Sequence, residues 1–229
     1  MKDYLPLGAK ACVFDFDGTL ADTEAFHFEL YRRLLGDGFG VDLAWEDWLH
    51  YIGRTDPDFH RMMEKDYGIT IDSEAVMAVY FRALLEEEPA AAAPYGWVRE
   101  VLTEAREKQI PACILSSGNR DVICACLKAW DLSGFFRDAN VISVSSGLFA
   151  KGDVFADPAR YLDGFSGGPG DVMLFEDSIH TIKTARGCGI GWVAGVTHGY
   201  NRGIEAFCDL LLDGSSASTA YTAPSGTRE

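Results

Sequence analysis

The chain has 229 residues, of which 48% are hydrophobic and 24% charged, a composition typical of a globular protein with a buried core. The formal net charge of -15 disfavours nucleic acids and acidic membrane surfaces as partners. No apolar run approaches the roughly 20 residues that cross a bilayer, and the N-terminal residues lack a signal-peptide pattern, so we expect a cytoplasmic protein. The six cysteines form no C-x-x-C pair, which favours buried reduced thiols over a zinc or redox site.

Short apolar runs rich in β-branched residues recur between helical stretches and indicate strands. Their sequences, in chain order, are CVFD (12–15), PACILS (111–116), NVISV (140–144), DVMLFE (171–176), GWVAGV (191–196) and CDLLL (208–212). This alternation predicts an α/β fold with a doubly wound, Rossmann-like sheet of mainly parallel strands.

A long insertion separates the first two predicted strands. Its apolar residues follow helical spacing, so residues 23–90 are predicted to form an α-helical cap on a core made of residues 1–22 and 91–212. One helix is expected to begin at Asp72 or Ser73 and to be stopped by Pro89, the alanines after it and Pro94. The segment EEEPAAAAPYGW, residues 86–97, is expected to be the linker that returns to the core. The small and polar residues 213–229 are predicted to be a disordered tail.

Polar side chains follow several predicted strands at the point where each strand ends. The pairs are Asp15 with Asp17, Ser116 with Ser117, and Glu176 with Asp177, and Lys151 follows a further apolar run. In open parallel sheets ligands bind at the carboxyl ends of the strands. Carboxylates at such an edge suit Mg²⁺ together with a substrate phosphate. One carboxylate can attack a phosphoryl group while a second protonates the leaving oxygen.

The segment DFDGTLADTEAFH, residues 15–27, resembles the first signature of the haloacid dehalogenase superfamily of phosphotransferases. Ser116, Lys151 and the acidic pair in FEDS then match the other three signatures in order. The segments PYGWVREVL, WDLSGFF and GVTHG add to a likeness that covers nearly all of the chain before the tail. The helical insertion directly after the first signature is similar to the subgroup of β-phosphoglucomutase and phosphoglycolate phosphatase.

The resemblance implies a role for each matching residue. It implies that Asp15 is the nucleophile, that Asp17 is the general acid and base, and that Ser116 and Lys151 hold the phosphoryl oxygens. The implied Mg²⁺ ligands are Asp15, Asp177, the main-chain carbonyl of Asp17, and Glu176 directly or through water. The candidate substrate-binding residues are His27, Arg54, Ser117, Gly118, Asn119 and Arg120.

The expected function is a Mg²⁺-dependent phosphatase that hydrolyses a small phosphorylated metabolite, such as a sugar phosphate, through an aspartyl-phosphate. A β-phosphoglucomutase-like mutase is the first alternative, but Asp56 stands where the mutase needs an arginine for a second phosphate. A catalytically silent phospho-ligand binding module is the second, although none of the four signatures is lost. Asp17 argues against a dehalogenase, which lacks a second aspartate there. His27 has an equally simple interpretation as a partly buried cap histidine, and Arg54 and Arg120 as solvated side chains.

Overall fold

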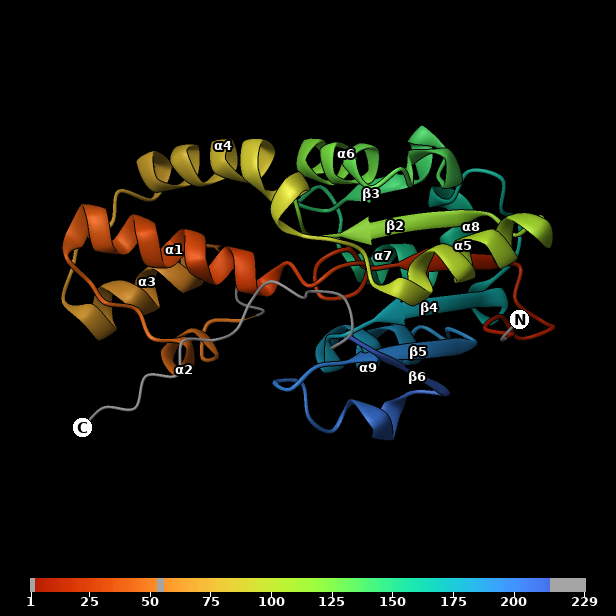
Figure 1. Cartoon of the computed structure of the whole chain (residues 1–229). Helices are drawn as coiled ribbons and strands as arrows, with labels where there is room; N and C mark the ends of the chain where they lie inside the picture. Colours follow the sequence, from red (N-terminus) through yellow and green to blue (C-terminus); the bar gives the residue numbers. More distant parts are fainter. Residues whose placement is uncertain (1–2, 53–55, 215–229) are drawn as a thin grey trace.

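The computed structural model describes residues 3–52 and 56–214, and its centre is a six-stranded sheet (Figure 1). The strands lie in the order β3-β2-β1-β4-β5-β6, and every neighbouring pair is parallel. Their bounds are β1 (Ala11–Phe14), β2 (Ala112–Ser116), β3 (Val141–Ser143), β4 (Val172–Glu176), β5 (Trp192–Thr197) and β6 (Leu210–Asp213). The expected fold class is confirmed. The chain winds outward from β1 in both directions, so the strand order reverses there.

Helices cover both faces of the sheet, and alternate residues of β1 point to the two faces. Cys12 and Phe14 pack in one cluster with helices α5 (Gly96–Glu107) and α6 (Arg120–Ala129). Ala11 and Val13 pack in the other cluster with α7 (Lys151–Ala156), α8 (Pro158–Tyr161) and α9 (Ile179–Gly187). A central strand that is buried on both sides needs apolar residues at every position, which explains its unbroken apolar run.

Most of the segment between β1 and β2, residues 24–91, is helical and lies beyond the carboxyl ends of the strands (Figure 1), while α5 at its end packs on the sheet. It contains α1 (Glu24–Phe39), α2 (Trp45–Trp48), α3 (Asp56–Tyr67) and α4 (Ser73–Ala91). The expected start of α4 is confirmed, because the Asp72 side chain accepts a hydrogen bond from the Ala75 N–H at 3.1 Å.

The expected stop of α4 between Pro89 and Pro94 is confirmed, since the helix ends at Ala91. Pro89 lies in the last turn and removes one N–H donor there, while the Ala92 N–H still bonds to the Glu88 carbonyl oxygen at 2.9 Å. Part of the expected linker is therefore helix, and α4 contacts α6 of the core.

Three further sequence expectations concern the tail, the membrane and the cysteines. Asp213, the first residue of the predicted tail, belongs to β6, and residues 215–229 lie outside the described part of the chain. Within the described ranges, no helix is long and apolar enough to cross a membrane. All six cysteines are free thiols, and Cys12, Cys113 and Cys126 are buried. Burial raises the pKa of these three thiols, so they are protonated and unreactive.

Candidate active site

The loop that follows β1 turns sharply at the carboxyl edge of the sheet. The Asp15 N–H still bonds to the Phe175 carbonyl oxygen of β4 at 3.0 Å, which extends the strand pairing by one residue. Gly18 then adopts φ +69°, and a Cβ atom at this position would lie 2.5 Å from Oδ2 of Asp177. Glycine is required here both by the backbone conformation and by the close approach of a carboxylate.

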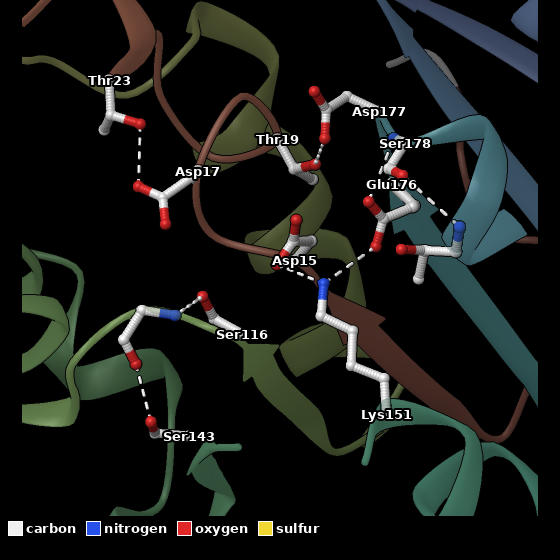
Figure 2. A network of polar contacts seen from close by, with 12 residues as sticks. Asp15, Asp17, Thr19, Thr23, Ser116, Ser143, Lys151, Glu176, Asp177 and Ser178 are labelled. Atoms are coloured by element: carbon white, nitrogen blue, oxygen red, sulfur yellow. Dashed lines mark hydrogen bonds and ion pairs between the residues drawn. The ribbon is translucent and has the colours of Figure 1, made fainter. Parts of the chain in front are cut away.

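Asp15 forms an ion pair with Lys151 beneath this loop (Figure 2). The Lys151 Nζ lies 2.8 Å from Oδ1 of Asp15 and 3.3 Å from Oε2 of Glu176. Burial lowers the pKa of Lys151, but the charges of Asp15 and Glu176 outweigh it and hold the pKa above that of an ordinary lysine. Lys151 is thus a fixed cation at the first residue of α7, beside the predicted nucleophile.

Asp15, Glu176 and Asp177 gather carboxylate oxygens within 4.8 Å of one another. Burial and the charge of Asp15 raise the pKa of Glu176 to about 8. Burial and the charges of Glu176 and Asp15 raise the pKa of Asp177 well above its usual range. Lys151 alone does not balance this negative charge. An all-oxygen donor set with excess negative charge fits a hard divalent cation such as Mg²⁺.

Neighbouring groups orient Asp177. The Thr19 hydroxyl donates to Oδ1 of Asp177 at 3.4 Å, and the Asn201 side-chain amide donates to the Asp177 carbonyl oxygen at 3.0 Å. His198 Nε2 lies 2.6 Å from the carbonyl oxygen of Gly18. Burial lowers the pKa of His198, so its ring is neutral at neutral pH and supports the loop by hydrogen bonding without adding charge.

The Asp17 side chain points away from this acidic cluster (Figure 2). Its Oδ1 accepts a hydrogen bond from the Thr23 hydroxyl at 2.8 Å and lies 4.0 Å from Nε2 of His27. The side chain is 33% exposed, and burial of the remainder raises the pKa of Asp17 to about 6 against the lowering effect of His27. A carboxyl group with such a pKa can exchange a proton near neutral pH.

A second polar cluster consists of Asp17, His27 and Glu88. Glu88 is 1% exposed, and its Oε2 lies 3.6 Å from Nε2 of His27. Burial lowers the pKa of His27, but the carboxylates of Glu88, Asp17 and Glu24 outweigh it and raise the pKa to about 9. His27 is therefore an imidazolium at neutral pH, and Asp17 contributes its carboxylate to this cluster and not to the acidic one.

The loop after β2 lies beside Asp17. The Ser116 hydroxyl, almost fully buried, accepts a hydrogen bond from the Gly118 N–H at 2.9 Å, and the Ser143 hydroxyl donates to the Gly118 carbonyl oxygen at 2.6 Å. A Cβ atom at Gly118 would lie 3.1 Å from Oδ2 of Asp17. Asn119 caps α6 by accepting from the Asp121 N–H at 2.8 Å.

Six predicted substrate-binding residues have different outcomes. His27, Ser117, Gly118 and Asn119 line a cavity of about 490 Å³ together with Asp17. Arg120 does not belong to it: its guanidinium binds the Asp138 side chain at 2.7 Å and the Val141 carbonyl oxygen at 3.2 Å, where it ties α6 to β3. Arg54 lies outside the described residues, as does the side chain of Asp56.

Sequence reasoning missed Glu88, because a run of three glutamates before a proline is typical of a solvated segment. The spacing of Tyr80, Leu84 and Glu88 is the signal that was available. Residues four apart share one helix face, and all three are buried.

Three features define an α/β enzyme site suited to phosphoryl chemistry: the reversal of the strand order at β1, the carboxylates of both polar clusters, and a half-buried lysine paired with two of them. The haloacid dehalogenase-like hydrolase family model matches residues 9–189. The chain belongs to this family of hydrolases, which confirms the expected family and the expectation of an enzyme.

Relatives of known name include phosphatases. The chain is 27% identical over 217 residues to a phosphorylated carbohydrates phosphatase of Thermotoga maritima, covering 85% of this chain and 88% of that protein. It is 26% identical over 222 residues to a phosphoglycolate phosphatase of Nitrosospira multiformis, covering 91% and 93%.

Solved structures share the fold. One described as a β-phosphoglucomutase of Thermotoga maritima has a TM-score of 0.65 at 24% identity and covers 90% of this chain and 94% of its own. CbbY of Rhodobacter sphaeroides in complex with phosphate has a TM-score of 0.69 at 21% identity and covers 89% and 93%.

Proposed function

We propose that this protein is a Mg²⁺-dependent phosphatase that hydrolyses a small phosphomonoester through an aspartyl-phosphate. The observation that carries the proposal is that Asp15 and Asp17 have different surroundings. Asp15 pairs with Lys151 at 2.8 Å and belongs to the acidic cluster, whereas Asp17 lines the cavity with a pKa of about 6. The names of the related phosphatases support the same reaction.

In the first step, an Asp15 carboxylate oxygen attacks phosphorus and the bond from phosphorus to the ester oxygen breaks. Protonated Asp17 gives its proton to that oxygen, and the alcohol leaves. Lys151 is proposed to compensate the charge on the phosphoryl oxygens, and the Ser116 hydroxyl to donate a hydrogen bond to one of them. In the second step, Asp17 takes a proton from water as the water oxygen attacks phosphorus, which releases inorganic phosphate and restores Asp15.

Asp15, Glu176, Asp177 and the Asp17 main-chain carbonyl are the residues proposed to hold Mg²⁺. When bound, the ion supplies positive charge that offsets the carboxylates and the phosphoryl oxygens. Residues 23–90 are proposed to act as a cap that excludes bulk water from the reaction. The cavity supports this role, because the cap helices and the loop after β2 line it together.

Phosphate release from a panel of phosphomonoesters, measured with Mg²⁺ and again with EDTA, tests the proposal. We expect release only with Mg²⁺, and we expect Asp15→Asn to lower kcat by roughly 10³-fold or more because the nucleophile is lost. Asp37→Asn, on the exposed surface of α1, is the matched control. Full activity in Asp15→Asn, or conversion of β-glucose 1-phosphate to glucose 6-phosphate without phosphate release, would contradict it.

A further inference from the structure

A cavity lies beside Asp17, between the helices of residues 23–90 and the loop after β2. Its volume of about 490 Å³ is in the range of small-molecule pockets. Asp17 lines it and Asp15 does not. Under the proposed mechanism Asp17 protonates the ester oxygen, so the alcohol portion of the substrate occupies this cavity. The residues that line the cavity therefore determine which alcohol portion of a substrate binds there.

The cap side of the cavity is an aromatic wall, formed by Tyr31, Trp48, Tyr51, Phe59, Tyr80 and Phe81. The rings hold one another in place: Tyr31 lies 4.6 Å from Phe59 and 4.7 Å from Tyr80 between ring centroids. Phe59 also contacts Tyr51 at 5.3 Å. An aromatic wall that is already packed needs little rearrangement to receive a flat ring.

Three of the four side chains of this wall that carry a polar atom use it within the protein. The Trp48 indole N–H donates to Glu24 at 2.7 Å, and the Tyr51 hydroxyl donates to Asp66 at 2.9 Å. The Tyr31 hydroxyl lies 3.3 Å from Nε2 of His60. The wall offers ring faces and edges to an occupant, and few donors or acceptors. A polyol would lose hydrogen bonds to water there without replacing them.

The charged side chains that line the cavity also favour an uncharged occupant. Among the described residues that line the cavity there is no lysine or arginine, and the charged side chains are Asp17, Glu24, His27 and Glu88. Nε2 of His27 lies 3.6 Å from Oε2 of Glu88 and 4.0 Å from Oδ1 of Asp17, so this side chain is paired with carboxylates of the protein itself. A leaving group that carries a second phosphate or a carboxylate would meet no free cation in this part of the lining.

We propose that the preferred substrates are phosphate monoesters of alcohols that carry a neutral aromatic ring. This inference rests on the phosphatase function proposed above and narrows its substrate class. The phosphoryl group is held at Asp15 and Lys151, while the ring packs against the aromatic wall. Stacked and edge-to-face contacts with several rings favour an aromatic occupant over a sugar.

Kinetics with three alkyl phosphates test the proposal: benzyl phosphate, glycerol 3-phosphate and glucose 6-phosphate. All three release an alcohol, so the bond that breaks is of the same kind. With Mg²⁺ present, we expect kcat/KM for benzyl phosphate to exceed that for the two hydrophilic esters by about ten-fold or more, because the ring leaves water on binding.

Two variants of α4 test the preference for benzyl phosphate over the hydrophilic esters. Phe81→Ala removes a half-buried ring of the wall, and Met77→Gln places an amide at Met77, which lines the cavity on the same helix as Phe81. Each is expected to lower the ratio of benzyl phosphate to glycerol 3-phosphate kcat/KM by about ten-fold. Val79→Ala is the control, since Val79 lies on the same helix, is 40% exposed and does not line the cavity.

The possible outcomes separate this inference from the function on which it rests. A benzyl preference that both wall variants reduce supports the inference. Release of phosphate with an equal or higher kcat/KM for the hydrophilic esters overturns it and leaves the phosphatase function standing. An unchanged ratio in both folded wall variants also overturns it. No release from any ester of the wider panel overturns the phosphatase function, and the inference with it.

Discussion

Asp15 and Asp17 are separated by one residue, but their side chains lie in different surroundings because the backbone turns at Gly18. Asp15 lies with Lys151 and the acidic cluster, while Asp17 lies with His27 and Glu88. The strand ends could be predicted from sequence, since carboxyl ends of parallel strands meet at one edge. The pairing of His27 with Glu88 could not, because it depends on how two cap helices pack.

The surroundings of the His27 ring predict that stability depends on pH. Its pKa rises to about 9 in the fold from an ordinary value of 6.5. The folded state binds the proton more tightly than the unfolded state, so this contribution is full below pH 6.5 and is lost as the pH rises through 9. We expect His27→Gln to remove on the order of 1 to 3 kcal/mol of this pH dependence.

Thermal or denaturant unfolding at low and high pH, in EDTA, measures the His27 contribution. Glu176 also titrates in this range, with its pKa raised to about 8, but it does so in both proteins. The difference between them therefore reports His27 together with its effect on the pKa of Asp17. Exposed His180→Gln, on the surface of α9, is the control. Equal pH dependence of wild type and His27→Gln would show that the imidazolium contributes nothing to stability.

At the scale of elements, the strands could be predicted closely and the helix ends less well. Apolar runs marked all six strands, and in β1, β2 and β4 every residue is buried, as strands covered on both faces require. Pro89 is a helix-stopping residue by itself, yet burial of Tyr80, Leu84 and Glu88 on one face continues α4 past it. Arg120 shows a related limit: its position at the start of α6 was predictable, but the direction of its side chain is set by Asp138.

The start of α4 depends on its cap. Asp72→Ala removes the acceptor of the Ala75 N–H and is expected to lower the free energy of unfolding by about 1 kcal/mol. Glu86→Ala, exposed on the same helix, is expected to leave it within about 0.5 kcal/mol of wild type. Chemical denaturation measures both, and equal stabilities would show that the cap is not important for folding.

At the scale of the whole molecule, the acidic cluster joins separate parts of the fold. Asp15 follows β1, Glu176 ends β4 and Asp177 follows it, with Lys151 from α7 between them. Raised pKa values of Glu176 and Asp177 mean that the folded chain bears a cost for this crowding when no cation is bound. The close approach of these carboxylates, which forms the site, therefore lowers the stability of the metal-free protein, as is common at functional sites.

Mg²⁺ is expected to remove this loss of stability by offsetting the negative charge of the cluster. An ion that binds the folded state alone stabilises it, by about 1 to 3 kcal/mol at concentrations well above its Kd, so the Tm of wild type should rise by several degrees. Asp177→Asn removes one of the crowded charges and one proposed ligand. In EDTA it should be at least as stable as wild type, whereas in millimolar Mg²⁺ it should be less stable. Asp37→Asn should follow wild type in both conditions, because Asp37 is exposed and does not belong to the cluster.

Scanning calorimetry of the three proteins with EDTA, Mg²⁺ and Ca²⁺ measures these differences in Tm. A Tm that Mg²⁺ raises equally in wild type and Asp177→Asn would place the ion elsewhere, and a lower Tm of Asp177→Asn in EDTA would show that its carboxylate stabilises the fold without a metal.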